Sequence, residues 1–244
     1  MNGILYQLAA ARRPAWIEPC LDSARAWAAG EGLSYRLYGD EAFAALPGDL
    51  VAKCGGRLQM VADLARLAIA RRLLEEEGWD RAVYADADFL IWDHAAFALR
   101  QMPCDRGAAF GQEYWVSRDA PRRKLHRNVH NAFMIFEKGG SVLPFYEETA
   151  RHLLARVEGG VPPQFLGPKL LTALQGPAAF SLLPQAGALS PDVIADLLGE
   201  SDGRALRHMK GALPRPLGGA NLCASLLGEE QAGRLVDRLL TRSA

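Results

Sequence analysis

The sequence lacks several features that mark particular classes of protein. Its four cysteines form no Cys-x-x-Cys pair, which argues against a zinc knuckle or thioredoxin-like site and favours a reduced setting. The 28 basic and 28 acidic residues balance, so the net charge gives no argument for binding nucleic acid. No apolar run approaches the roughly 18 to 20 residues that cross a membrane, and the N-terminus lacks the basic region of a signal peptide. We therefore expect a soluble, cytoplasmic protein that contacts a membrane at most peripherally.

The chain has neither internal repeats nor a linker long enough to divide it. With 244 residues, half of them apolar, it can bury a sizeable core. We therefore expect a single domain over residues 1–244.

The N-terminal region has the pattern of a strand, a helix and a second strand. Gly3–Leu8 is typical of a buried strand, Pro14–Ala29 of a helix that Gly30 ends, and Ser34–Tyr38 of an alternating strand. This βαβ beginning predicts an α/β fold with a mainly parallel sheet. Further helices are expected at residues 58–77, 141–157, 167–176, 190–199 and 221–242, and further strands at residues 82–85, 108–111, 131–136 and 179–183.

The most informative segment is Arg81–Trp92, in which two aspartates interrupt an apolar strand. Residues two apart in an extended chain point to the same side, so Asp86 and Asp88 can face one small partner. A divalent cation would neutralise both, and Mg²⁺ or Mn²⁺ prefers such oxygen ligands and shares them with substrate phosphates. The alternative is a solvated Asp-x-Asp turn at the end of the strand.

Three other segments carry polar groups with two interpretations each. Asp63 and Arg66 lie one turn apart on the helix at 58–77, either as an ordinary surface pair or as part of a site. The basic segment Arg118–Arg127 is either a solvated loop or a flap that meets an anionic acceptor or diphosphate. His208, in a stretch rich in glycine and proline, is either an exposed loop residue or a metal ligand.

Together these segments resemble glycosyltransferases of the GT-A nucleotide-sugar fold that carry a DxD motif. One similar group is the family with a DXD-containing sugar-binding region, which includes initiation-specific mannosyltransferases and clostridial glucosylating toxins. Its pattern is matched here by Asp63, Arg66, Gly78, Tyr84, Asp86 and Asp88. The other is the glycogenin and lipopolysaccharide galactosyltransferase type, whose motifs have counterparts in Arg66, Asp86, Asp88, Asn131, His208 and Gly211. The Lys-Pro-Trp that ends the last of those motifs is missing here.

The resemblance implies a fold and an activity. The fold would be a single Rossmann-like GT-A domain with a mixed, mainly parallel sheet flanked by helices. Residues 3–110 would form the nucleotide-sugar-binding half, and residues 111–244 the acceptor-side half with the C-terminal helix. The activity would be metal-dependent transfer of a sugar from a UDP-sugar, rather than a GDP-sugar, to a saccharide or other hydroxyl acceptor. Both similar groups retain the anomeric configuration, which implies retention here.

The resemblance also implies which residues hold the cation. Asp88 would be the main direct ligand of Mn²⁺ or Mg²⁺, and Asp86 would lie near the metal, the ribose or both. His208 would be the third metal ligand, and Gly211 would let the backbone approach a phosphate closely.

Other residues would contact the donor or the acceptor. Asp63 and Arg66 would reach the donor sugar and its diphosphate, since arginine offers a fork of donors and aspartate accepts from hydroxyl groups. Asn131 would bind the donor sugar or the acceptor. Tyr6, at the end of the first strand, would stack on or flank the nucleotide base.

Two rival functions remain open at this point. A phosphatase of the HAD type also places Asp-x-Asp after a strand, with the first aspartate as nucleophile. Here, however, Phe89 and Leu90 follow the motif, and no convincing later acidic pair is present. The second rival is a catalytically degenerate module that binds a nucleotide sugar or a partner protein.

Overall fold

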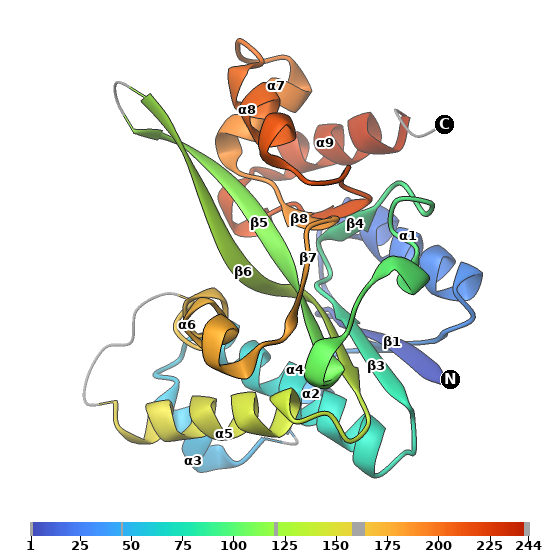
Figure 1. The fold of residues 1–244 in the computed structure, drawn as a ribbon, viewed down its shortest axis with the longest axis vertical. Coiled ribbons are helices and arrows are strands. Elements are labelled where there is room, and N and C mark those ends of the chain that lie inside the picture. Colours follow the sequence, from blue (N-terminus) through green and yellow to red (C-terminus); the bar gives the residue numbers. More distant parts are fainter. Residues whose placement is uncertain (1, 45, 120–121, 158–163, 242–244) are drawn as a thin grey trace.

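A mixed six-stranded sheet forms the centre of the computed structural model, which describes residues 2–44, 46–119, 122–157 and 164–241 (Figure 1). Its strands are β1 (Gly3–Leu8), β2 (Ser34–Tyr38), β3 (Arg81–Ala85), β5 (Ala108–Asp119), β6 (Arg122–Glu137) and β7 (Ser181–Leu183). They are ordered β2-β1-β3-β6-β5-β7, and three of the five pairings are parallel. A smaller sheet has the order β4-β9-β8, made of β4 (Phe89–Ile91), β9 (Gly219–Asn221) and β8 (Ala186–Ala188). This confirms the expected α/β fold class.

Helices cover both faces of the large sheet, so alternate residues of its central strands enter different cores. The helices are α1 (Ile17–Gly30), α2 (Glu41–Ala44), α3 (Gly48–Lys53), α4 (Leu58–Glu75), α5 (Val142–Ala155), α6 (Pro168–Ala178), α7 (Pro191–Leu198), α8 (Arg204–Ala212) and α9 (Glu229–Thr241). Tyr6 and Tyr84 pack with α4 and α5, whereas Leu5 and Val83 pack with α1. Both faces of β1 and β3 are therefore buried, which explains their nearly continuous apolar runs.

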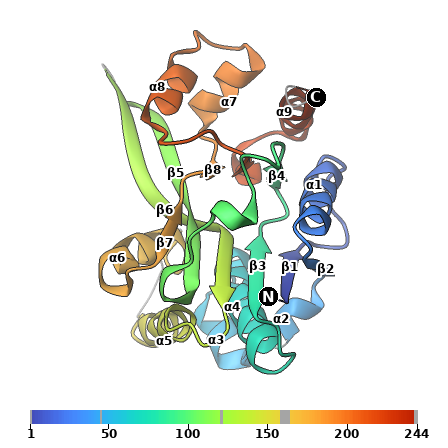
Figure 2. The ribbon, with the colours of Figure 1, turned by 45° about the vertical axis from the view of Figure 1, so that its right-hand side comes forward.

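The upper part of the molecule is a third layer built on the small sheet. There α7, α8 and α9 lie together, away from α4 and α5 (Figures 1 and 2). Their core includes Leu90 of β4, Ala220 of β9 and Val193 of α7. The small sheet thus joins the C-terminal helices to the chain that follows β3.

Three predicted elements are wrong in type or extent. The basic segment Arg118–Arg127 is not a loop: within the described residues it forms the end of the antiparallel β5–β6 hairpin, and residues 120 and 121 lie outside the description. The segment around His208 is helix α8 instead of a loop. The closing helix begins at Glu229, because Asn221 ends strand β9.

None of the helices in the described part of the chain is long and apolar enough to cross a membrane. The division into two functional halves stays a prediction. The large sheet contains strands from both halves: β3, from the first, pairs with β6, from the second, over five residue pairs.

Candidate functional site

Asp86 lies where β3 ends, at the centre of the large sheet. Its backbone N–H donates to the Ala132 carbonyl on neighbouring β6 at 2.8 Å. Its own carbonyl accepts from Phe89 N–H at 3.0 Å and from the Gln7 side-chain amide at 3.0 Å. The chain therefore turns tightly after β3 and enters β4, which holds Asp86 and Asp88 on one short segment.

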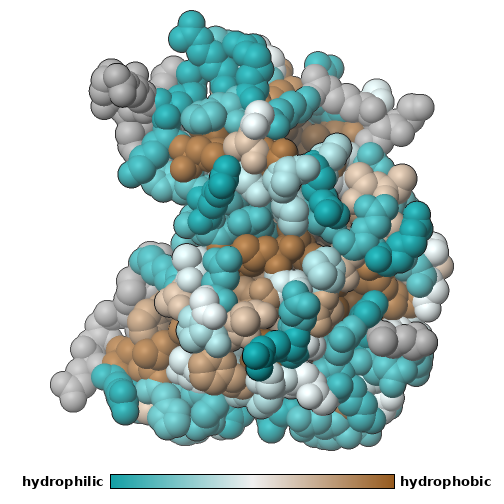
Figure 3. All heavy atoms as spheres, in the orientation of Figure 1, coloured by the Kyte–Doolittle hydropathy of each residue, from teal (hydrophilic) through white to brown (hydrophobic). Residues whose placement is uncertain are grey.

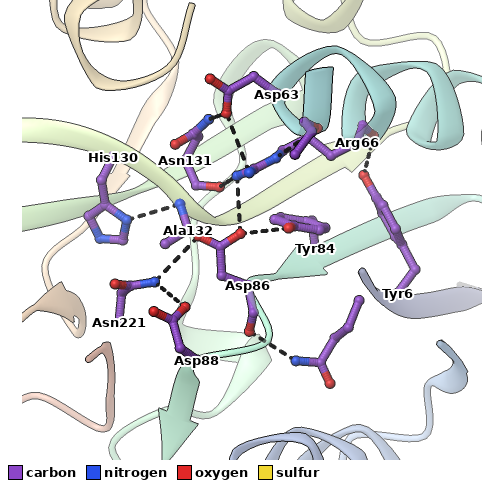
Figure 4. A network of polar contacts seen from close by, with 12 residues as sticks. Tyr6, Asp63, Arg66, Tyr84, Asp86, Asp88, His130, Asn131, Ala132 and Asn221 are labelled. Carbon is purple, nitrogen blue, oxygen red and sulfur yellow. Dashed lines mark hydrogen bonds and ion pairs between the residues drawn. The ribbon is translucent and has the colours of Figure 1, made fainter. Parts of the chain in front are cut away.

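The Asp86 carboxylate is fixed on one side by β3 and α4. The Tyr84 hydroxyl donates to its Oδ1 at 2.6 Å, and the Arg66 Nη1 lies 3.2 Å from the same oxygen (Figure 4). The Arg66 guanidinium also lies over the Tyr84 ring, 4.7 Å from its centroid. Although it is paired in this way, the Asp86 side chain keeps 24% of its surface exposed.

Asn221 joins the two carboxylates. Its Nδ2 donates to Asp88 Oδ1 at 2.7 Å and reaches Asp86 Oδ2 at 3.3 Å (Figure 4). Its Oδ1 accepts from Cys223 N–H at 2.8 Å, which orients the amide. The backbone N–H of Ala224 donates to the second oxygen of Asp88 at 2.9 Å.

The pKa of Asp88 is raised to about 6, first because the surrounding protein displaces water and then because Asp86 repels a second negative charge. Within the described residues Asp88 makes no ion pair, unlike Asp86. The turn therefore holds two close carboxylates of which only one is neutralised by a basic side chain.

Asp63, Arg66 and Asn131 form a buried network behind Asp86 instead of a surface pair. Asp63 and Arg66 are only 3% and 6% exposed. Asn131 Nδ2 donates to Asp63 Oδ1 at 2.7 Å, Arg66 Nη2 lies 3.3 Å from the same oxygen, and Arg66 Nη1 donates to the Asn131 carbonyl at 2.9 Å. These three residues thus contact one another and Asp86, and their predicted contact with a donor sugar stays a prediction.

Burial and neighbouring charges shift the pKa values of Asp63 and Arg66. Burial raises the pKa of Asp63 to about 6, although Arg66 and Asn131 act in the opposite direction. Burial alone would lower the pKa of Arg66, but Asp86, Tyr84 and Asp63 outweigh it, so the pKa is raised. Arg66 therefore stays charged and anchors the network.

Tyr6 does not lie where it could stack on a nucleotide base. Its side chain is fully buried, and its hydroxyl donates to the Arg66 carbonyl at 2.6 Å. Its ring packs against Tyr84 and Tyr38, with centroids 5.2 and 6.4 Å away. The prediction failed because β1 is covered on this face by α4, so that Tyr6 supports the helix that carries Arg66.

His208 and Gly211 both lie on α8, and the structure does not join them to the carboxylates. The His208 side chain is exposed, and the described residues contain no group of three or more histidine, cysteine, aspartate or glutamate side chains that could hold a metal. A Cβ at Gly211 would meet no atom within 4 Å, so no close approach requires glycine there. The third group at the carboxylates is Asn221 instead.

His130 is a buried residue near the site that the sequence analysis missed. Its Nδ1 accepts from Ala132 N–H at 3.2 Å and its Nε2 donates to the Ala186 carbonyl at 2.9 Å, which requires the neutral ring. Burial lowers its pKa accordingly. The carbonyl of Ala132 accepts a hydrogen bond from Asp86 N–H. His130 therefore connects Ala186 of β8 to the residue of β6 that supports Asp86.

The oxygen atoms of this turn fit a hard divalent cation. Asp86 and Asp88 supply carboxylate oxygens, and Asp88 has no basic partner among the described residues; burial and then the charge of Asp86 raise its pKa, and a cation would offset both. A third oxygen is available from Asn221, whose amide would have to turn its Oδ1 towards the carboxylates. Asn221 was missed because its position in the sequence, 133 residues from Asp88, gives no local signal.

The comparisons with known proteins identify the fold. No protein-family model and no curated protein matches the chain. Among solved structures, a glycosyltransferase involved in the glycosylation of the major capsid of PBCV-1 is similar over 97% of this chain and 99% of that chain, with 7% identity and a TM-score of 0.51. The galactosyltransferase LgtC, solved with donor and acceptor sugar analogs, is similar over 96% and 95%, with 12% identity and a TM-score of 0.47. At such identities the likeness concerns the fold, and this chain has the GT-A-like fold of the first structure.

Proposed function

We propose that the chain is a metal-dependent glycosyltransferase that moves a sugar from a nucleotide-diphosphate sugar, a UDP-sugar in preference to a GDP-sugar, to a saccharide or other hydroxyl acceptor. One observation carries the proposal. Asp86 and Asp88 converge on Asn221 at the end of β3, and Asp88 has no basic partner among the described residues. The GT-A-like fold supports the same function, and the resemblance of the sequence to retaining groups favours retention of the anomeric configuration.

The cation would be held by Asp86, Asp88 and Asn221. Bound there, Mn²⁺ or Mg²⁺ would supply Lewis-acid stabilisation for the diphosphate that leaves the sugar. The residues of the chain supply the positioning: Tyr84 and Arg66 fix one oxygen of Asp86, and Ala224 N–H fixes one oxygen of Asp88.

The buried network gives Asp63, Arg66 and Asn131 a positioning role in this proposal. Arg66 reaches Asp86, Asp63 and the Asn131 carbonyl at once, which suits the fixed planar fork of donors on a guanidinium. A carboxylate held in this way needs little reorganisation when the charged donor arrives. The four cysteines are unpaired, which supports a cytoplasmic setting.

The test is a thermal-shift panel of UDP- and GDP-sugars with and without Mn²⁺, on the wild type and on Asp88→Asn. A ligand that binds only the folded state raises the melting temperature, and a free concentration of 100 times Kd corresponds to about 2.7 kcal/mol. We expect one donor to stabilise the wild type only when Mn²⁺ is present, and Asp88→Asn to lose that effect. Asp105→Asn, an aspartate outside this network that accepts from Ser181, is the matched control and keeps the effect.

Other outcomes would point elsewhere. Hydrolysis of simple phosphate esters without any donor-dependent shift would contradict the transferase and favour the phosphatase. Binding of a nucleotide sugar without any transfer or hydrolysis would favour the degenerate binding module.

A further inference from the structure

A large pocket of the described structure lies beside the carboxylate site, and neither Asp86 nor Asp88 lines it. It has a volume of about 1030 Å³ and lies between α7, α8, α9 and the segments that follow β4 and precede β9. Ten of its fourteen lining residues are apolar, among them Trp92, Leu189, Leu206, Met209, Leu213 and Leu217. In Figure 3, hydrophobic residues show between hydrophilic ones in the upper part of the molecule. A pocket of this size and character suits an elongated apolar group.

The charged residues at the pocket have an excess of positive charge. Lys210 and Arg215 are exposed, and neither side chain makes a hydrogen bond or ion pair with the described residues. His94 is the third basic residue of the lining and is also exposed. The acidic residue of the lining is Asp93, whose Oδ1 already accepts from Ala96 N–H at 2.9 Å. Two free cations beside an apolar pocket fit a ligand that combines an apolar chain with an anionic group.

The pocket shares its wall with the carboxylate site. Leu189, in the lining, donates its N–H at 3.0 Å to the carbonyl of Asn221, the residue that joins the two carboxylates. Trp92 follows Asp88 by four residues, with β4 between them, which is at most about 13 Å of chain. The pocket and the two carboxylates are therefore close neighbours in the fold, on either side of the segment that carries Asn221.

We propose that the pocket binds the apolar chain of a lipid phosphate to which the acceptor saccharide is linked. The phosphate lies at Lys210 and Arg215, and the saccharide extends towards Asp88. This rests on the proposed function and deepens it, because it assigns the acceptor to the class of lipid-phosphate-linked saccharides.

The first test measures binding without donor or cation, so that it does not depend on transfer. Octyl, decyl and dodecyl phosphate are titrated below their micelle concentrations and followed by calorimetry, with dodecanol and inorganic phosphate as partial ligands. We expect each added methylene to strengthen binding by about fourfold until the pocket is filled. Dodecyl phosphate should bind more tightly than either partial ligand.

The second test separates the cations from general electrostatics. The double variant Lys210→Gln with Arg215→Gln should weaken dodecyl phosphate about tenfold and leave dodecanol unchanged. The matched control, Lys138→Gln with Arg238→Gln, removes the same charge from exposed residues outside this pocket and should have little effect. An equal loss in both double variants, no dependence on chain length, or binding to anionic vesicles without binding of monomeric dodecyl phosphate would each overturn the proposal.

Transfer assays then distinguish this inference from the proposed function. A saccharide linked to dodecyl phosphate should have a KM at least tenfold lower than the free saccharide, and the Lys210→Gln, Arg215→Gln variant should remove that advantage. Equal KM values for the two acceptors would overturn the lipid-phosphate inference and leave the transferase intact. Binding of dodecyl phosphate with no transfer to either acceptor would overturn the transferase and, with it, the assignment of the lipid as an acceptor.

Discussion

Asn221 joins two carboxylates that would otherwise repel each other. A single amide nitrogen donates to both, and the Cys223 N–H holds the amide in place from behind. The neighbouring Arg66 neutralises Asp86 and leaves Asp88 without a basic partner. The residues closest to the proposed chemistry thus differ in role. Asp88 is poised to meet a cation, Arg66 positions Asp86, and Asn221 orients both carboxylates and would offer the cation a third oxygen.

Replacing Asn221 by alanine should weaken the response to the cation. Residues that orient metal ligands typically contribute 10- to 100-fold in metal affinity, so Asn221→Ala should need about 10- to 100-fold more Mn²⁺ for half-maximal stabilisation by the donor. Titration of the melting temperature with Mn²⁺ measures this. Asn128→Ala removes another asparagine–carboxylate bond, from Nδ2 to Glu113 Oε1 at 2.6 Å, and serves as the control. An equal shift in both variants would refute the role of Asn221.

The buried carboxyl of Asp63 should make stability depend on pH. Its pKa in the folded protein is raised to about 6, above about 3.9 in an unfolded chain. The folded state therefore binds the proton more tightly: its contribution is full below about pH 4 and is lost as the pH rises through 6. Between pH 4 and 8, the wild type should lose about 2 kcal/mol of unfolding free energy relative to Asp63→Asn.

Urea unfolding of both proteins at several pH values checks this prediction. The difference between them isolates Asp63, because other titrating groups such as His130 are common to the two proteins. A difference that stays constant over this pH range would show that Asp63 ionises without cost in the folded state.

The β5–β6 hairpin carries the basic segment near the site. It extends beyond the sheet towards α8 (Figure 1), and Arg123 near its end pairs with Asp202 at 3.1 Å. Arg127 lies over the Tyr114 ring on the facing strand, 5.6 Å from its centroid. The described basic residues of this segment therefore lie along a strand pair that contacts the turn between α7 and α8, and not in an irregular loop.

Two glycine-to-alanine substitutions should have opposite effects, because Gly219 lies in a close contact between strands and Gly211 lies in a helix with free space around it. A Cβ at Gly219 would lie 3.0 Å from the Leu90 carbonyl and 2.8 Å from the Phe89 ring, so Gly219→Ala pushes β9 away from β4. Because Asn221 ends β9, we expect at least a tenfold loss of transfer activity. Gly211→Ala on α8 meets no atom within 4 Å and should instead raise the unfolding free energy by about 0.5–1 kcal/mol.

Activity assays and urea unfolding of the two variants measure these effects. Full activity in Gly219→Ala would show that the position of β9 does not matter for the site. Loss of activity in Gly211→Ala without loss of stability would support the prediction that the backbone at Gly211 approaches a phosphate of the donor.

The molecule as a whole is organised around strands that come from distant parts of the chain. β3, from the first half, pairs with β6, from the second, and β6 pairs in turn with β5. The small sheet likewise joins β4 to β9 and β8. Asp86 lies where these two sheets meet, so the site and the core depend on the same pairings.

We therefore predict that the chain unfolds in one cooperative transition. Circular dichroism and tryptophan fluorescence, which report on secondary structure and on the environment of the five tryptophans, should give coincident urea curves. Neither fragment, 1–110 or 111–244, should fold alone, since each exposes one strand of the β3–β6 pair. Separate transitions, or a folded fragment 1–110, would contradict a single domain.

The sequence by itself determined the features that depend on neighbouring residues. The βαβ beginning, the helix α4, the strand before Asp86 and the helix α7 follow from local periodicity and from caps and glycine stops, and each lies close to its predicted range. The sequence also predicted that Asp86 and Asp88 lie together, although a tight turn closed by Phe89 N–H and the Asp86 carbonyl, not an extended chain, brings them there.

Only the tertiary structure decided which side chains surround those two aspartates. Asn221 meets Asp88 across 133 positions, and Arg66 meets the Asn131 carbonyl across 65. Tyr6, which we expected beside a nucleotide base, is buried instead, because α4 covers the face of β1 on which its side chain lies. Such contacts depend on how helices and strands pack, and no spacing within a single segment records them. The sequence therefore placed the carboxylates, and the packing of β9, α4 and β6 around them selected their partners.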